Sequence, residues 1–154
     1  MELSLPHLEQ FIVEAKRHTY VGNGKRLLPY RLGTKDLQYS AQDWTYHDSY
    51  AGESNFIGQE LVYLGQQPVW GMNYFGVILR PELLTSAQAG QMIKKSLSKL
   101  YEEGRFLGGF TFQDGSLTYI DTNEGDVSYF RGLEYINVNE VRAYELHYHG
   151  GLLL

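Results

Sequence analysis

The C-terminal residues include the clearest candidates for metal or acid–base chemistry. Glu145, His147 and His149 stand at every second position. On a β-strand this spacing directs all three side chains to the same face. Two imidazoles and a carboxylate are a common ligand set for a divalent metal, and an imidazole beside a carboxylate also forms an acid–base pair. A solvated strand face shows the same alternation, so metal binding by Glu145, His147 and His149 is the minor alternative and no cofactor is expected.

A hairpin of residues 127–136 and 141–149 decides which acid lies beside these histidines. The sequence places a two-residue turn at or next to Asn139. With such a turn, even-numbered residues of the first strand share a face with odd-numbered residues of the second. Glu134 then lies on the same face as Glu145, His147 and His149. We therefore predict that Glu134 and His149 belong to one site.

Two further acids are placed among apolar residues. Asp48 alternates with Tyr46, and Glu60 alternates with Val62. In apolar surroundings the ionised form of a carboxyl group is disfavoured unless it is paired, and enzymes use this effect to make a general acid or base. A structural ion pair with an arginine produces the same sequence pattern. Both interpretations of Asp48 and Glu60 remain open.

Aromatic residues are the class in excess, with thirteen tyrosines, seven phenylalanines and two tryptophans. Trp70, Met72 and Tyr74 alternate along one stretch and would form one face of a strand. Such a face can stack a sugar or a base, and core packing explains it equally well.

Well-marked enzyme motifs are missing from the sequence. It contains no Gly-x-Ser-x-Gly elbow, no zinc-protease helix motif and no dinucleotide fingerprint. The run from Gly22 to Lys25 resembles a phosphate loop only superficially, because it lacks the required spacing and the following serine or threonine.

The spacing of apolar residues predicts the elements that position these side chains. Helices are expected at residues 5–18 and 86–103, with a loop at 22–24 after the first. Short aromatic and β-branched runs predict strands at 37–40, 44–50, 56–64, 69–76, 109–113, 116–121, 127–136 and 141–149. The sequence shows no internal repeat and no linker. We therefore predict one α+β domain over residues 1–154, in which a curved antiparallel sheet of about eight strands packs on two helices, in the order α-β-β-β-β-α-β-β-β-β.

Composition limits the partners. The chain has 154 residues, no cysteine and a formal net charge of −5. The missing cysteines exclude disulfides and thiolate metal sites, and the negative charge disfavours direct binding to nucleic acid. No apolar run is long enough for a membrane helix, and the N-terminal residues do not resemble a signal peptide. We expect a soluble, cytoplasmic protein without a membrane partner.

Five stretches of the sequence together carry a resemblance to known proteins. They are Asp36-Leu37-Gln38-Tyr39, Tyr46-His47-Asp48-Ser49-Tyr50, Phe56-Ile57-Gly58-Gln59-Glu60, Trp70-Gly71-Met72-Asn73-Tyr74 and His149-Gly150-Gly151. With them the chain resembles, over about residues 11–151, an uncharacterised bacterial domain family whose members occur alone or behind a helix-turn-helix in transcriptional regulators of the XRE class. The resemblance implies a self-contained bacterial module with a sensing role where a DNA-binding domain is attached, and it implies no activity.

Three functional hypotheses follow. The leading one is a module that binds a small polar or aromatic ligand in a concave aromatic and acidic pocket. The second is a small hydrolase or isomerase with Glu60 or Glu134 as general base and His149 as its partner. The third is a homodimeric interaction protein without a ligand. The residues expected to line the pocket are Tyr46, Asp48, Glu60, Trp70, Tyr74, Glu134 and His149.

Overall fold

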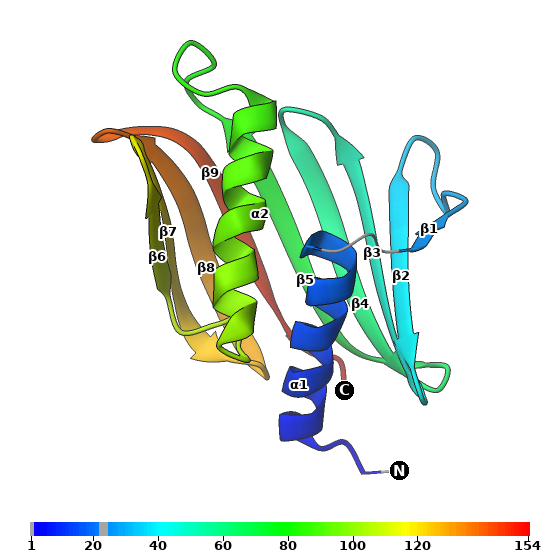
Figure 1. Cartoon of the computed structure of the whole chain (residues 1–154). Helices are drawn as coiled ribbons and strands as arrows, with labels where there is room; N and C mark the ends of the chain where they lie inside the picture. The colour runs from blue at the N-terminus through cyan, green and yellow to red at the C-terminus, as the bar shows by residue number, and fades with distance from the viewer. Residues whose placement is uncertain (1, 22–24) are drawn as a thin grey trace.

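A single antiparallel sheet forms the frame of the molecule (Figure 1). The computed structural model describes residues 2–21 and 25–154, and in these the sheet has nine strands in the order β1-β2-β3-β4-β5-β9-β8-β7-β6. The strands are β1 (Lys25–Leu27), β2 (Lys35–Ala41), β3 (Trp44–Gly52), β4 (Phe56–Leu64), β5 (Gln67–Ile78), β6 (Phe110–Asp114), β7 (Leu117–Asp126), β8 (Tyr129–Val138) and β9 (Val141–Leu152).

Two helices precede the two sets of strands. Helix α1 (Leu5–Lys16) has Pro6 in its first turn, where the missing N–H costs nothing, and continues into a π-helical turn, η1 (Arg17–Val21). Helix α2 (Ser86–Glu102) begins with a capping box, in which Thr85 and Gln88 each accept a hydrogen bond from the backbone N–H of the other. No helix in residues 2–21 and 25–154 has the length and apolar character needed to cross a bilayer.

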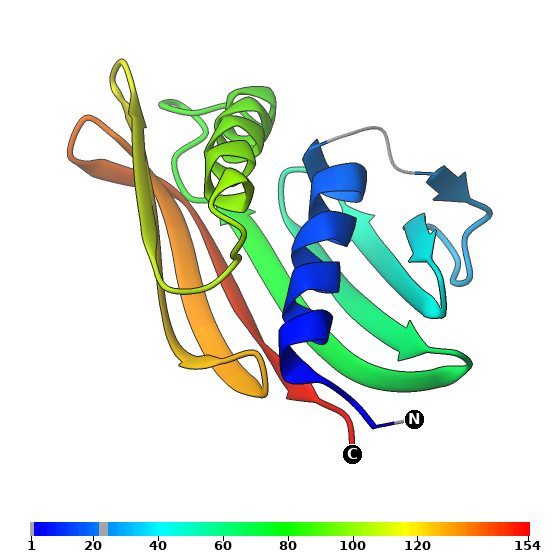
Figure 2. The same ribbon diagram turned by 60° about the horizontal axis from the view of Figure 1, so that its bottom comes forward.

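Both helices pack on the concave face of the sheet, which curls up around them at its two edges (Figure 2). The core lies between the helices and this face. Leu8 and Ile12 of α1 and Met92 and Leu100 of α2 are almost fully buried there. No helix of the described part of the chain lies on the opposite, convex face of the sheet.

The predicted α+β class and curved antiparallel sheet are confirmed, with a helix before each group of strands. The number of strands was wrong, because the structure adds β1 to the predicted eight. A run of only three residues with two charges, Lys25 to Leu27, gives no alternating pattern from which a strand can be predicted. The loop expected at residues 22–24 lies outside the described residues.

A β-bulge overturns the predicted faces of the last hairpin. Next to the turn, Asn137 pairs with Arg142, but one residue further Ile136 pairs with Tyr144, so Ala143 is the extra residue. A bulge shifts the pairing by one residue and reverses which positions share a face. As a result Glu134 lies opposite Leu146, on the concave face, and not on the face of Glu145, His147 and His149.

The expectation of no internal repeat was also wrong. Helix α1 with strands β2–β5 and helix α2 with strands β6–β9 are two copies of one unit. The final strands of the two units, β5 and β9, pair in the middle of the sheet. There Tyr74 lies directly opposite Tyr148, its own counterpart 74 positions later. The bulge at Ala143 likewise has its counterpart in β5, between the pairs Val62–Trp70 and Tyr63–Pro68. The sheet therefore has an approximate two-fold axis that passes between the two tyrosines.

Close packing of tyrosine rings on glycines repeats in both units. The ring of Tyr74 covers Gly58 so closely that a Cβ at Gly58 would overlap it, and Tyr148 covers Gly132 in the same way. Since each glycine leaves room for a ring on the neighbouring strand, both hydroxyls are held in equivalent positions over the concave face. These two hydroxyls lead to the candidate site.

Candidate functional site

Four carboxyl groups lie on the concave face, beneath the helices. Asp48 and Glu60 are cross-strand neighbours in the first unit, as are Asp121 and Glu134 in the second. Each is at most 6 % exposed to solvent. We call these four residues the acidic cluster. It repeats with the internal symmetry and occupies the middle of the core, where uncompensated charge is costly.

Tyrosine hydroxyls donate hydrogen bonds to the carboxyl groups in the same pattern in each unit. In the first unit, Tyr46 donates to Glu60 and Tyr74 donates to Asp48, the latter at 2.7 Å.

In the second unit Tyr119 donates to Glu134, and Tyr148 donates to Asp121, again at 2.7 Å. A third tyrosine, Tyr144, also donates to Glu134 at 3.1 Å. These donors satisfy the carboxyl groups as hydrogen-bond acceptors but bring no positive charge.

Lys16 is the one buried cation among the described residues. Its Nζ atom lies 2.9 Å from both carboxylate oxygens of Glu60 and over the ring of Phe106. Counted from the helix starts, Lys16 takes the position on α1 that Leu97 has on α2. Among the described residues the second unit therefore has no buried cation at this position, and one buried lysine faces the four carboxyl groups.

The imbalance of charge appears in the pKa values of the acids. Burial raises the pKa of Asp48 to about 7, helped by the negative charge of Glu60 and opposed by Tyr74 and Lys16. Burial also raises the pKa of Glu134 to about 7 and that of Asp121 to about 6. Where no cation is present, a bound proton neutralises the carboxyl group instead.

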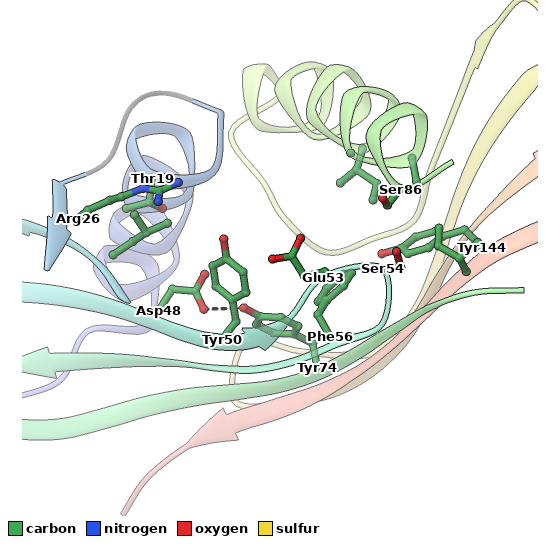
Figure 3. A pocket seen from close by; sticks show the side chains of 15 residues that line it. Thr19, Arg26, Asp48, Tyr50, Glu53, Ser54, Phe56, Tyr74, Ser86 and Tyr144 are labelled. Atoms are coloured by element: carbon green, nitrogen blue, oxygen red, sulfur yellow. Dashed lines mark hydrogen bonds between the residues drawn. The ribbon is translucent and has the colours of Figure 1, made fainter. Parts of the chain in front are cut away.

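One edge of the acidic cluster opens into a pocket of about 550 Å³, which we call the outer pocket (Figure 3). Asp48 and Tyr74 form part of its floor, and Ala89, Gly90 and Ile93 of α2 form one wall. Its lining is mainly apolar, with a few polar groups at the mouth, and its volume falls in the range of small-molecule sites. The other lining residues are Thr19, Arg26, Leu37, Tyr50, Glu53, Ser54, Phe56, Ile78, Ser86 and Tyr144.

The second unit fills the space that corresponds to the outer pocket. Phe56 and Tyr144, which line the pocket, have Phe130 and Trp70 as counterparts. In the second unit the ring of Phe106 packs edge-on against both counterparts, with ring centres 5.8 and 5.9 Å away. Hence the fold can close this space with its own side chains, and in the first unit the side chains that the structure describes leave it open.

A smaller cavity of about 60 Å³ lies at the two-fold axis, which we call the central cavity. Lys16, Glu60, Asp121 and Glu134 all line it. Its walls are mainly apolar, but with these four polar side chains its size suits one or two water molecules rather than an organic ligand. It connects the two halves of the acidic cluster.

Six of the seven residues predicted to line a pocket lie on the concave face. Asp48 and Tyr74 line the outer pocket, and Glu60 and Glu134 line the central cavity. Tyr46 is fully buried and donates to Glu60.

Trp70 is also fully buried, and its indole N–H donates to the backbone oxygen of Val127 at 3.0 Å. Trp70 therefore packs in the core and is not free to stack a ligand.

His149 is the exception among the predicted residues. It lies exposed on the convex face, opposite Asn73 of β5. The sheet separates it from Glu60 and Glu134, so the pairs proposed for acid–base catalysis are not formed. His147 lies 3.6 Å from Glu145 on the same convex face, yet no group of three His, Asp or Glu side chains among the described residues is placed to hold a metal. The alternative metal set of Glu145, His147 and His149 is therefore not formed.

The sequence analysis missed Lys16, Asp121 and Tyr148. Each had a signal. Lys16 follows Leu8 and Ile12 at intervals of four, which places it on the apolar face of α1. Asp121 and Tyr148 are the repeats of Asp48 and Tyr74, 73 and 74 positions later.

Comparison with known proteins identifies a family for the part of the chain that holds these acids. The family model described as a domain of unknown function (DUF5680) matches residues 48–153, which include the whole acidic cluster but not Lys16. No curated protein and no solved structure matches the chain.

Proposed function

This chain belongs to the DUF5680 family of domains of unknown function, and we propose that it binds a small molecule in the outer pocket. The observation that carries the proposal is the difference between the two units. A space that Phe106 fills in the second unit is a pocket of about 550 Å³ in the first. Since filling the space would add apolar contacts, leaving it open costs stability and favours a binding role.

Small residues on α2 support the same interpretation. Counted from the helix starts, Ala89 and Gly90 take the positions that Leu8 and Glu9 have on α1. A Cβ atom at Gly90 would meet nothing within 4 Å. Glycine in the middle of a helix costs about 1 kcal/mol relative to alanine, and nothing in the packing around Gly90 requires it. A binding site explains both small residues.

We further propose a sensor role for the ligand site. The sequence resembles domains found behind a helix-turn-helix, in which ligand binding is a natural input. In the described residues α1 is followed by strands, so the DNA-binding part of such a regulator would have to be another domain or another chain.

The homodimer hypothesis stays a prediction. The surface that favours it is the convex face of the sheet, where Ile57 and Phe75 are exposed cross-strand neighbours. This face is independent of the outer pocket, so the two hypotheses are compatible.

A thermal-shift screen with a blocking variant tests the ligand site. We expect at least one compound from a panel of amines, amino acids, nucleosides and sugars to raise the melting temperature of the wild type. A ligand at about 100 times its Kd adds about 2.7 kcal/mol, or about 5 to 11 °C for a domain of this size. Gly90→Leu is expected to keep the fold and lose this shift, because its side chain enters the pocket mouth.

Gly90→Ala is the matched control. It should raise the melting temperature of the free protein through helix propensity and keep the shift with the same compound. Equal shifts in wild type and Gly90→Leu would place the ligand elsewhere. No shift with any compound of the panel would count against the proposal.

A further inference from the structure

Asp48 is a buried carboxyl group that forms no ion pair within residues 2–21 and 25–154. It is 2 % exposed, and among the described residues only Tyr74 donates a hydrogen bond to it. The nearby ammonium group of Lys16 is held between the two oxygens of Glu60. On its concave face the first unit thus buries two carboxyl groups with one cation, and the carboxyl group without an ion pair lies at the floor of the outer pocket.

The pocket walls around Asp48 suit the apolar part of a ligand that also carries a positive charge. The rings of Tyr50, Phe56, Tyr74 and Tyr144 line the pocket, and Figure 3 shows them gathered over the sheet on one side of Asp48. Aromatic faces attract organic cations and also stack flat apolar groups. A buried carboxyl beside several rings is a combination that recognises a cationic nitrogen attached to an aromatic body.

The second unit shows how the chain itself occupies the equivalent site. Burial raises the pKa of Asp121, the counterpart of Asp48, to about 6, and hydrogen bonds from Tyr148 and Asn123 oppose the rise, followed by the positive charge of Arg105. Arg105 does not contact Asp121, because its guanidinium group pairs with Glu103 and donates to the backbone oxygens of Leu107 and Gly109. The next residue, Phe106, places its ring on Phe130 and Trp70, and this segment of the chain thus supplies an aromatic ring at the site and a positive charge farther away.

We infer that the ligand of the outer pocket is an aromatic amine, whose ammonium group pairs with Asp48 and whose ring packs among Tyr50, Phe56 and Tyr144. The inference rests on the proposed function and adds the chemical class of the ligand. Two charged side chains at the mouth of the pocket also affect which ligand charge is favoured. Glu53 adds a second negative charge, while Arg26 lies on the Thr19 side of the pocket and is exposed (Figure 3).

Three matched probes test the class of ligand by isothermal titration calorimetry. Tryptamine carries an ammonium group, tryptophol a neutral hydroxyl and indole-3-propionate a carboxylate on similar indole side chains. We expect tryptamine to bind the full chain at least tenfold more tightly than the other two, which corresponds to about 1.4 kcal/mol. Asp48→Asn should reduce tryptamine binding to the level of tryptophol.

Asp121→Asn is the matched control, because it makes the same change at the counterpart of Asp48 in the filled unit. It should leave the affinity for tryptamine within about twofold of the wild type. Asparagine has nearly the shape of aspartate and can still accept from the tyrosine, so both variants are expected to fold. Tyr74→Phe gives a second test, since it leaves Asp48 in place and should keep the preference for tryptamine.

Other outcomes separate this inference from the proposed function. Equal binding of all three probes, lost in Gly90→Leu, would overturn the inference and support the ligand site. Tighter binding of indole-3-propionate would also overturn it and assign recognition to Arg26. If none of the probes binds at millimolar concentration, the aromatic-amine class is wrong, and the broader panel alone decides on the proposed function.

Discussion

Lys16→Met is expected to lower the free energy of unfolding by about 3 to 5 kcal/mol at pH 8. Lys16 is 5 % exposed, and its ammonium group lies 2.9 Å from both carboxylate oxygens of Glu60. Removing it leaves Glu60 buried beside Asp48 without a cation. Methionine keeps most of the side-chain volume, so the loss reports on charge and not on a cavity. Urea unfolding followed by circular dichroism measures it.

Two further variants make the result specific. Lys94→Met removes an exposed lysine of α2 and should change stability by less than about 0.5 kcal/mol. Adding Glu60→Gln to Lys16→Met should recover much of the loss, because the buried charge disappears with its partner. A cost for Lys16→Met as small as that of Lys94→Met would mean that the pair with Glu60 does not hold the acidic cluster together.

Stability is expected to fall by at least about 3 kcal/mol as the pH rises from about 5 to about 8. Burial raises the pKa of Asp48 and Glu134 to about 7 and that of Asp121 to about 6. In the unfolded chain these groups ionise near their ordinary values of 3.8 for Asp and 4.5 for Glu. Between these limits the folded protein binds more protons than the unfolded chain. The stabilisation is therefore complete below about pH 4 and is lost as the pH passes through 6 and 7.

Each carboxyl group that is protonated only in the folded state contributes a slope of about 1.4 kcal/mol per pH unit. Glu134→Gln should therefore reduce the slope of stability against pH by about the contribution of one proton. Asp114→Asn, at an exposed position, should leave the slope unchanged. Asp36, although buried, does not add to the fall in stability between about pH 5 and pH 8. Burial opposes its ionisation, but hydrogen bonds from Thr34 and His47 outweigh burial and lower its pKa. Urea midpoints at five pH values measure the slope, and stability that is constant or rises with pH would show that the acids are ionised in the folded state.

Alternation of residue types predicted the faces of β3 and β4 correctly and those of the last hairpin, β8 and β9, incorrectly. Strands β3 and β4 are regular over their predicted ranges, so Asp48 and Glu60 share the concave face as the period of two requires. Strand β9 contains a bulge at Ala143, which no local pattern marks. A single extra residue was enough to move Glu134 and His149 to opposite faces, and with them the predicted acid–base pair.

The internal repeat was present in the sequence and was missed. Phe56-x-Gly58-x-Glu60 returns as Phe130-x-Gly132-x-Glu134 after 74 residues, and Tyr46-x-Asp48 returns as Tyr119-x-Asp121 after 73. Tyr74 likewise returns as Tyr148, while most of the other positions differ in residue type. The residues that repeat are those fixed by geometry and hydrogen bonding, namely the glycine beneath a tyrosine ring and the acid that accepts from a tyrosine.

The pairing of Lys16 with Glu60, in contrast, could not be predicted from the sequence. Its spacing places it on the apolar face of α1, but a lysine there also fits the end of a helix, where a cation favours the helix dipole. Its partner Glu60 is 44 residues away. The pair follows from how α1 lies across the sheet, which is a property of the packed structure.

Methyl NMR of isoleucine side chains tests the central claim, a ligand site in the outer pocket, most directly. Ile78 and Ile93 line the pocket, while Ile57 lies exposed on the convex face and Ile136 is buried without lining it. On titration with a compound that raises the melting temperature, we predict saturable shifts of the Ile78 and Ile93 methyl signals and no change at Ile57. Saturable shifts at Ile57, with Ile78 and Ile93 unchanged, would place binding on the convex face and contradict the account.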